Sequence, residues 1–394
     1  EATPWPSWNA LLPVAGAVLV LAADAPRSLL SAPPLQRLGD WSYSIYLWHW
    51  PLVVALAYFG LGGAWTVAFF AASIAAGRLS FVFIEKPARA WLAARDARPR
   101  VPALRFGAFT AASLAVVAAC GAVMAGKGFP HRSPALAAAY DASVSAAADY
   151  GYPLDRCGGV TTFGRQLKLC EVGLSSPGSD ILVIGDSFAE MWYARVAALE
   201  TRLRNHAVVF ATKGGCVPVR GVERVQPGMD CGAFGEAALE LARSGRFRTV
   251  VFAAMWTSYF TRGGSNTRFC SPEGCAATAT EAGFGPAMDS FARQVADLRH
   301  AGKEVVVMTT SPYPNVDVGT QMRRRALAGE RVDSEWSFDF AAIRDASMPV
   351  DGALLALAGR GATVIDLEEL LCREGACPSV TGGAPLYTDT SHLR

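Results

Sequence analysis

Long stretches without a charged side chain dominate the first 126 residues of the chain. The uncharged runs cover residues 5–23, 41–77 and 106–126, and glycines interrupt the second run near residue 60. About 20 apolar residues in a row are enough for a helix that spans a bilayer. We therefore predict four transmembrane helices, near 5–23, 42–59, 64–84 and 106–126. Buried helices of a soluble protein are the alternative.

After residue 150, short apolar runs of strand length alternate with patterns typical of helices. The predicted strands are Ile181–Ile184, Ala207–Ala211, Thr249–Ala254, Glu304–Thr309 and Ala362–Asp366. The predicted helices lie near 188–204, 234–244, 286–301 and 341–358. This alternation predicts a three-layer α/β domain, in which a parallel sheet is covered by helices on both faces.

Two segments do not fit the alternation. Residues 127–156 are rich in Ala, Ser and Tyr, and we expect a stalk or a packing helix there. Residues 312–340 are expected to form a long excursion that carries Arg323, Arg324 and Arg325. We interpret these arginines as a solvated charge run, with contact to an anionic glycan as the alternative. The predicted domains are 1–126, 127–156 and 157–394.

The composition favours a membrane protein. The 394 residues are 52% hydrophobic and 18% charged, with a mean hydropathy of +0.24, which is too apolar for an ordinary soluble protein. The net charge of +2 gives no indication of a nucleic-acid partner. The lipid bilayer is therefore an expected partner, and nucleic acid is not.

Basic residues indicate how the predicted helices are oriented. The connection between the third and fourth helices has only two acidic residues, Glu85 and Asp96. It has six basic residues, which are Lys86, Arg89, Arg95, Arg98, Arg100 and Arg105. Positive loops stay in the cytoplasm, so the chain after Lys127 is expected outside the membrane. Counting back places the start of the chain outside too, and we expect residues 1–126 to be the last part of a larger multi-pass membrane domain.

Eight of the nine cysteines lie after residue 150 and fall into local pairs. The pairs are Cys157 with Cys170, Cys216 with Cys231, Cys270 with Cys275, and Cys372 with Cys377; Cys120 stands alone in an apolar run. An even count confined to one region predicts disulfides and an oxidising compartment. Structural zinc is the weaker alternative because no histidine lies near the tight pairs, and we expect no metal.

A serine at the end of a predicted strand carries the candidate chemistry. Gly185, Asp186 and Ser187 follow the run Ile181–Ile184, and Asp389 and His392 stand at the end of the chain. The spacing Asp-x-x-His lets one turn present both side chains, so that Asp389 orients His392 and His392 takes the proton of Ser187. We predict a catalytic triad of Ser187, His392 and Asp389. The alternative for Ser187 is a helix N-cap.

Acyl transfer by a serine also needs donors for the oxyanion. We expect the backbone N–H groups of Ser187 and Gly215 in this role, because Gly214 and Gly215 follow the second predicted strand. Turn residues are the alternative for both glycines. Among the other histidines, His49 lies in a predicted membrane span, where an ionisable residue is costly. An interfacial structural role and a catalytic role remain open for His49.

Residues 155–394 resemble the SGNH/GDSL esterase superfamily, with Gly-Asp-Ser as its first block and Asp-x-x-His as its last. The third block of that superfamily normally supplies an asparagine to the oxyanion hole. Here Trp256 stands near that place, which resembles SGNH domains fused to acyltransferase-3 membrane proteins and makes Trp256 a candidate for substrate contact. Residues 38–51 and 83–89 are similar to the closing membrane helices of that family.

The resemblance implies an activity and a location. Members of the family O-acetylate bacterial surface polysaccharides such as lipopolysaccharide O-antigen, at the inner membrane, with the SGNH domain in the periplasm. It implies a polysaccharide or a lipid-linked glycan as acceptor, no bound cofactor, and acetyl-CoA as the donor to the membrane domain. A periplasmic carbohydrate acetyl esterase and a non-catalytic domain that positions glycan are the alternatives.

Overall fold

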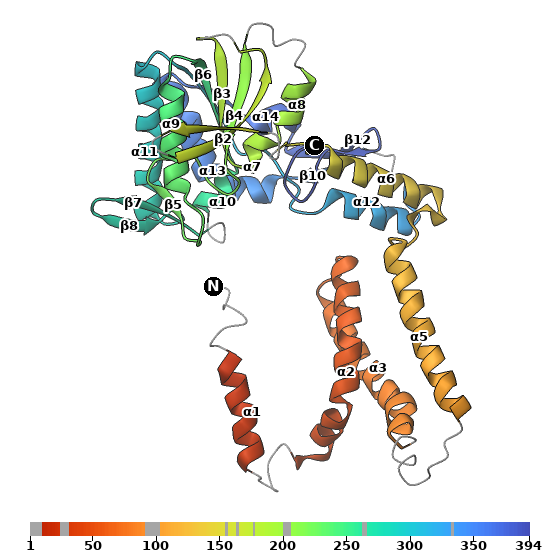
Figure 1. Ribbon diagram of the computed structural model, residues 1–394. Coiled ribbons are helices and arrows are strands. Elements are labelled where there is room, and N and C mark those ends of the chain that lie inside the picture. Colours follow the sequence, from red (N-terminus) through yellow and green to blue (C-terminus); the bar gives the residue numbers. More distant parts are fainter. Residues whose placement is uncertain are drawn as a thin grey trace. The chain divides into compact units, whose positions relative to one another are not determined.

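The computed structural model describes nine stretches of the chain: residues 10–23, 31–90, 103–153, 157–162, 165–175, 178–199, 206–261, 266–331 and 335–394. The chain divides into two compact units, Glu1–Ala125 and Gly126–Arg394. Figure 1 shows the helices of the first unit and the sheet of the second. Each unit is described by itself.

Helices make up the described part of the first unit. They are α1 (Leu11–Ala23), α2 (Pro33–Tyr58), α3 (Ala64–Ser80), the π-helical turn η3 (Phe81–Glu85) and α5 (Ala103–Ala125). Helix α2 begins earlier than predicted and takes in Arg37 and Asp40, and residues 5–9 of the first predicted span lie outside the described residues. Within the described stretches, one helix, Ala64–Ala90, is long and apolar enough to cross a membrane, and Leu11–Val20 and Thr110–Ala125 are shorter apolar helices. Spanning of the bilayer by all four helices stays a prediction.

Helices α2 and α3 pack closely. A Cβ on Gly77 would lie 2.5 Å from Ile45 Cγ1, so the glycine permits this approach. The hydroxyl of Ser44 donates to Glu85 Oε2 at 2.6 Å and joins α2 to η3. His49 Nδ1 lies 2.7 Å from the carbonyl oxygen of Tyr46 in the same helix, so its polar contact is local.

A seven-stranded sheet forms the centre of the second unit. Its order is β1 (Gly158–Thr162), β2 (Arg165–Gly173), β4 (Ala207–Thr212), β3 (Asp180–Gly185), β6 (Phe247–Ala253), β9 (Glu304–Met308) and β11 (Thr363–Ile365). The last five strands in this order are mutually parallel, and all five were predicted from their apolar runs. The expectation of a wholly parallel sheet is wrong, because β1 and β2 are antiparallel to each other and β2 is antiparallel to β4. Only two residues separate β1 from β2, and so short a connection can join only antiparallel strands.

Helices cover both faces of this sheet (Figure 1). On one face, Leu182 and Ile184 pack in a cluster with residues of α9 (Cys231–Arg243), α11 (Glu281–His300) and α13 (Ala341–Leu355). On the other face, Val183 packs in a cluster with residues of α7 (Ser187–Glu190) and α8 (Tyr193–Ala198). Alternate residues of β3 thus point to opposite layers, as a buried strand requires.

Smaller elements surround the main sheet. Helix α6 (Pro134–Ala148) matches the packing helix that was expected at 127–156 as the alternative to a stalk, and the others were not predicted. Two three-stranded sheets are β10 (Trp336–Asp339), β12 (Ala376–Thr381) and β13 (Ala384–Pro385), and β5 (Val222–Arg224), β7 (Thr267–Ser271) and β8 (Gly274–Ala277). The short helical elements are η4 (Pro130–Arg132), α6 (Pro134–Ala148), α10 (Trp256–Phe260), α12 (Val318–Leu327), η6 (Ala356–Arg360) and α14 (Leu367–Leu371). The expected excursion at 312–340 therefore contains a helix and a strand.

The arginine run on α12 is bound to neighbouring side chains. Arg323 donates to Ser143 Oγ at 2.7 Å and to Thr320 Oγ1 at 2.8 Å. The guanidinium of Arg325 lies 4.6 Å from the centroid of the Trp336 ring. The interpretation of a solvated charge run is wrong for these two residues, because tertiary contacts hold their charged groups.

Candidate active site

Gly185 and Asp186 form the turn that carries Ser187 at the carboxyl end of β3. A Cβ on Gly185 would lie 1.8 Å from the carbonyl oxygen of Ala253, so only glycine fits between β3 and β6. The carboxylate of Asp186 caps α7 by accepting a bond from the backbone N–H of Phe188 at 2.8 Å. Asp186, and not Ser187, is therefore the N-cap, and the hydroxyl of Ser187 remains free for chemistry.

The structure brings the three predicted triad residues together. His392 Nε2 lies 2.8 Å from Ser187 Oγ, and His392 Nδ1 lies 2.7 Å from Asp389 Oδ2. If Nδ1–H donates to Asp389, Nε2 is free to accept the serine proton, which is the tautomer that a general base needs. The three groups thus have the geometry of a Ser-His-Asp relay.

A tight turn holds the aspartate of this relay. Asp389 Oδ1 accepts backbone N–H bonds from Ser391 at 2.7 Å and from His392 at 2.8 Å. Burial by itself would raise the pKa of Asp389, but these bonds, the side-chain bond from His392 and the charge of His392 outweigh it and hold the pKa well below its usual value. The carboxylate therefore stays ionised and fixes the orientation of the imidazole.

Two aromatic rings lie against the imidazole. The ring of Tyr150 meets His392 edge-on with centroids 5.4 Å apart, and the ring of Phe188 lies at 5.1 Å. Tyr150 was not among the predicted site residues. No motif surrounds it in the Ala-rich segment after residue 127, so its role is visible only in the tertiary structure.

Asp186 lies at the centre of a buried network beneath the triad. Its carboxylate accepts bonds from the hydroxyl of Tyr259 at 2.7 Å and from the backbone N–H of Met255 at 3.1 Å. Burial raises the pKa of Asp186 to about 6, against the lowering effect of these bonds and of His392. Asp186 thereby connects the nucleophile turn to the segment after β6. Like the role of Tyr150, this structural role was not predicted from the sequence.

Gly215 lies in the loop that follows β4, next to β3 in the sheet. The loop begins beside the nucleophile turn, because the N–H of Lys213 donates to the carbonyl of Gly185 at 3.0 Å. Gly215 has φ +77°, and a Cβ there would lie 2.4 Å from Arg224 Nη1. The position therefore requires glycine, and the oxyanion role of its N–H stays a prediction.

Trp256 does not lie where a substrate could reach it. Its side chain is completely buried, and its indole N–H donates to the carbonyl of Met308 at 2.8 Å. The ring packs on Phe291 with centroids 5.1 Å apart. Trp256 is a core residue in this structure, and the expected substrate contact is corrected accordingly, because burial leaves no surface for a ligand.

The four predicted disulfides are confirmed. Cys157 is bonded to Cys170, Cys216 to Cys231, Cys270 to Cys275 and Cys372 to Cys377, and Cys120 is a free cysteine. The bond at Cys216 adjoins Gly215, so it holds the candidate oxyanion loop to α9. These bonds exclude the alternative of zinc at the paired cysteines.

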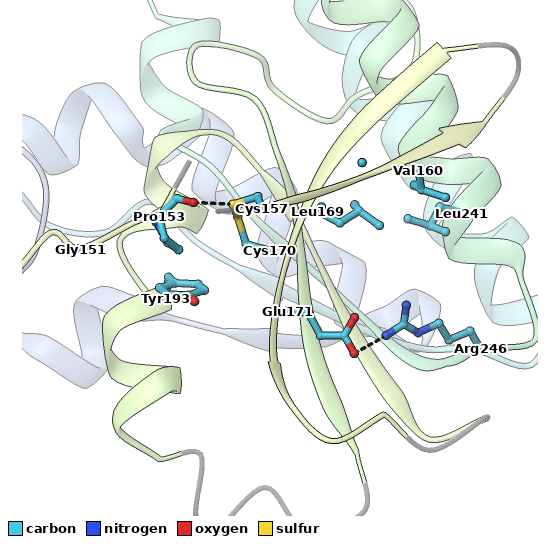
Figure 2. Close-up of a pocket in the computed structure, with 12 residues that line it drawn as sticks. Gly151, Pro153, Cys157, Val160, Leu169, Cys170, Glu171, Tyr193, Leu241 and Arg246 are labelled. Carbon is cyan, nitrogen blue, oxygen red and sulfur yellow. Dashed lines mark hydrogen bonds and ion pairs between the residues drawn. A yellow bond between two sulfur atoms is a disulfide. The ribbon is translucent and has the colours of Figure 1, made fainter. Parts of the chain in front are cut away.

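A pocket of about 720 Å³ lies where β1 and β2 form the edge of the main sheet (Figure 2). Gly151, Pro153 and Tyr193 line one part of it, and Gly151 directly follows Tyr150. Glu171 and Arg246 line another part and pair with each other at 2.8 Å. Because Arg246 also binds the buried Asp180 at 2.8 Å, the polar lining is committed to internal contacts and indicates no particular ligand.

Comparisons with known proteins found similar sequences and structures. A protein of Komagataeibacter xylinus named "Putative membrane-bound transacylase BcsY" is 38% identical over 85 residues, which are 21% of this chain and 22% of that protein. The chain thus matches only about a fifth of that relative's length. Among solved structures, the lipopolysaccharide acetyltransferase periplasmic domain of Salmonella ser. Paratyphi A is 12% identical, with a TM-score of 0.41 over 56% of this chain and 78% of that one. A GDSL-like lipase of Bacteroides thetaiotaomicron is 9% identical, with a TM-score of 0.28, and the match covers 63% of this chain and 89% of the lipase chain.

The family model described as "SGNH domain (fused to AT3 domains)" matches residues 156–394, which is more than half of the chain and includes Ser187, Asp389 and His392. The protein belongs to the family of SGNH domains that are fused to AT3 domains.

Proposed function

We propose that the protein is a serine-dependent O-acyltransferase that transfers an acyl group, most simply acetyl, to a hydroxyl of a bacterial cell-surface polysaccharide such as lipopolysaccharide O-antigen. The observation that carries the proposal is the distance of 2.8 Å between His392 Nε2 and Ser187 Oγ, with Asp389 bound to the other ring nitrogen. A transacylase among the relatives supports acyl transfer as the class of reaction.

The triad supports a two-step reaction. In the first step Ser187 Oγ attacks the acyl carbonyl while His392 takes the hydroxyl proton, and His392 then gives that proton to the leaving group as the acyl-enzyme forms. In the second step a sugar hydroxyl attacks the acyl-enzyme, His392 takes its proton, and the proton returns to Ser187 as the bond to serine breaks. The N–H groups of Ser187 and Gly215 would stabilise the oxyanion in both steps.

The proposal also includes a location and a donor. Disulfides form and persist in oxidising compartments, which supports a periplasmic second unit. The first unit would lie in the inner membrane with several spans, and the membrane domain would receive acetyl from cytoplasmic acetyl-CoA. The acceptor would be the polysaccharide itself or a lipid-linked glycan.

Hydrolysis is the second candidate, because water can reach the triad. The side chain of Asp389 is 49% exposed and that of His392 is 19% exposed. If water rather than a sugar attacks the acyl-enzyme, the same residues make a carbohydrate esterase.

The test measures the acetyl content of surface polysaccharide in bacteria that carry the full-length protein. Wild type is compared with Ser187→Ala and with Ser271→Ala, a change at an exposed serine of the β7–β8 hairpin. We expect Ser187→Ala to abolish acetylation and Ser271→Ala to leave it unchanged at equal protein levels. Unchanged acetylation in Ser187→Ala would contradict a catalytic serine and favour a glycan-positioning domain, and a rise would identify an esterase.

A further inference from the structure

The segment between Ser145 and Tyr150 contacts both halves of the triad. It contains the end of α6 and the turn that follows, and it precedes the residues of the family match, 156–394. Ser187 and His392 are far apart in sequence and come from separate elements. A third segment that binds both sides therefore influences whether they stay aligned.

Tyr150 is the first of these connections. Its hydroxyl lies 3.1 Å from Glu190 Oε2 and 3.3 Å from the carbonyl oxygen of Ser187. Its proton is thus shared by the last residue of α7 and by the nucleophile, the first residue of α7. Its ring meets the His392 ring edge-on at 5.4 Å. One side chain thus fixes the backbone of the nucleophile and limits the movement of the base.

Asp149 and Ser145 make the second connection, to the end of the loop that carries His392. Arg394 Nε donates to Asp149 Oδ2 at 2.5 Å, and Arg394 Nη2 lies 3.3 Å from Ser145 Oγ. Arg195 of α8 also approaches Asp149, at 3.7 Å. Because Arg394 follows His392 by two residues, its ion pair with Asp149 and its hydrogen bond to Ser145 anchor the catalytic loop. Figure 1 shows the C-terminus beside α6.

Helix α6 is itself firmly seated on this unit. Leu136 and Ala139 are buried in a cluster with Val318 and Met322 of α12. Arg323 reaches across to Ser143 at 2.7 Å, and a Cβ on Gly319 would lie 2.7 Å from the Ser143 side chain. The segment that ends in Tyr150 is therefore a packed part of the fold and can hold the contacts described above.

We propose that residues 145–150 are a working part of the active site and that Tyr150 is a positioning residue, which keeps the imidazole of His392 aligned with Ser187 Oγ and shields it from water. This inference rests on the proposed function, because it assumes that Ser187 and His392 react as a pair. It assigns a role to a stretch of the second unit that lies before the residues of the family match.

The charges around His392 determine what loss of Tyr150 would do. Asp389 is bonded to the imidazole, and the carboxylate of Asp186 also interacts with its charge. Glu190 of α7 is bonded to the Tyr150 hydroxyl, and all three carboxylates act on that hydroxyl. Burial and these carboxylates raise the pKa of Tyr150 far above its usual value, so its hydroxyl stays a donor. Removal of the ring would admit water to the imidazole and favour imidazolium. The acid limb of the pH–rate profile, where the rate falls as the pH falls, would therefore shift to higher pH.

The experiment follows the reaction of Ser187 with a fluorophosphonate probe in the full-length protein in detergent, from pH 5 to 9. Tyr150→Leu removes ring and hydroxyl, and Tyr150→Phe removes only the hydroxyl. The matched controls are Tyr152→Leu and Tyr152→Phe, since the hydroxyl of Tyr152 is bonded to Thr212 at 2.8 Å and its ring packs on Tyr193. Thermal melting checks that each variant is folded.

We expect Tyr150→Leu to react about tenfold more slowly at pH 7 and to move the acid limb upward by about half a pH unit. Tyr150→Phe should restore the acid limb to its wild-type position while the reaction stays about threefold slower, because the hydroxyl bond to the nucleophile turn is lost. Tyr152 variants should match wild type in both respects.

A wild-type rate and acid limb in folded Tyr150→Leu would overturn the positioning role alone. Should Tyr150→Leu fail to fold, a wild-type rate in Tyr150→Phe would overturn it. A wild-type protein whose Ser187 the probe does not label, as judged against Ser187→Ala, would overturn the proposed function and the positioning role together.

Discussion

The hydroxyl of Tyr259 donates a 2.7 Å hydrogen bond to the carboxylate of Asp186, and so joins α10 to the turn that carries the nucleophile. The second residue of Gly-Asp-Ser is thus part of the support of the site. It is completely buried, whereas Ser187 beside it is half-buried. The motif combines a structural carboxylate with a reactive hydroxyl.

Replacement of Asp186 by asparagine should change how stability depends on pH. The pKa of Asp186 is raised from 3.8 to about 6 in the folded protein by burial, so the folded state holds its proton more tightly than the unfolded state. Its contribution to stability is therefore present below pH 3.8 and is lost as the pH rises to 6, by about 3 kcal/mol. Asp186→Asn cannot ionise and should not show this loss. Urea unfolding at pH 3.5 and pH 7 measures it, and a difference between the two proteins that is the same at both pH values would contradict the prediction.

Asp389→Asn should nearly abolish the reaction while the fold survives. The amide cannot hold Nδ1 as a donor in the same way, and loss of the orienting carboxylate in a serine triad costs about 10⁴ in rate. The matched control is Asp366→Asn, since Asp366 likewise accepts backbone bonds, from Glu368 and Glu369, at the start of α14. Ester hydrolysis by the purified protein measures both. Equal loss in the two variants would indicate a general effect on folding.

The low pKa of Asp389 has a consequence for acid stability. A carboxylate with a lowered folded pKa stabilises the fold above its unfolded pKa, and this contribution is lost as the pH falls. Wild type should therefore lose stability below about pH 4 more steeply than Asp389→Asn does. Thermal melting from pH 3 to 7 compares the two slopes, and parallel curves would argue against the pKa shift.

The parallel part of the sheet was predictable because buried parallel strands are continuous apolar runs. β3 and β9 have this pattern, and it placed Ser187 at a carboxyl strand end. β2 has no such run, since Arg165, Lys168 and Glu171 interrupt it, and the antiparallel edge was missed.

Trp256 shows a different limit of prediction from sequence. Its place after β6 was correct, but only tertiary packing shows that its ring enters the core. Tyr150 is found in the same way, through contacts with residues distant in sequence.

Gly215→Ala should slow acyl transfer, and Gly214→Ala should not. Alanine at 215 meets an unfavourable φ of +77° and the flexible end of the Arg224 side chain, so we expect the backbone of the loop to shift. If its N–H binds the oxyanion, the loss should be about 10²-fold in rate. A Cβ on Gly214 meets nothing within 4 Å, which makes this neighbour a close control. The rate of acyl-enzyme formation with an activated ester is the measurement, and equal rates in both variants would exclude the oxyanion role of this loop.

The disulfides should contribute to stability according to the length of chain that they close. The loop-entropy estimate is about 3 kcal/mol for Cys216–Cys231, with a separation of 15 residues, and about 2 kcal/mol for Cys270–Cys275, with a separation of 5. The double variant Cys216→Ala with Cys231→Ala should also slow the reaction, because that bond adjoins Gly215. The bond between Cys270 and Cys275 lies on the β7–β8 hairpin, so its removal should affect stability alone.

Thiol counting and unfolding in denaturant test the two parts of this prediction separately. The denatured, unreduced protein should show one free thiol, that of Cys120, and reduction should expose all nine. Nine thiols before reduction would remove both the disulfides and the argument for an oxidising compartment. If the thiol count holds but the two double variants lose activity equally, the bond at Cys216 stabilises the unit without aligning the oxyanion loop.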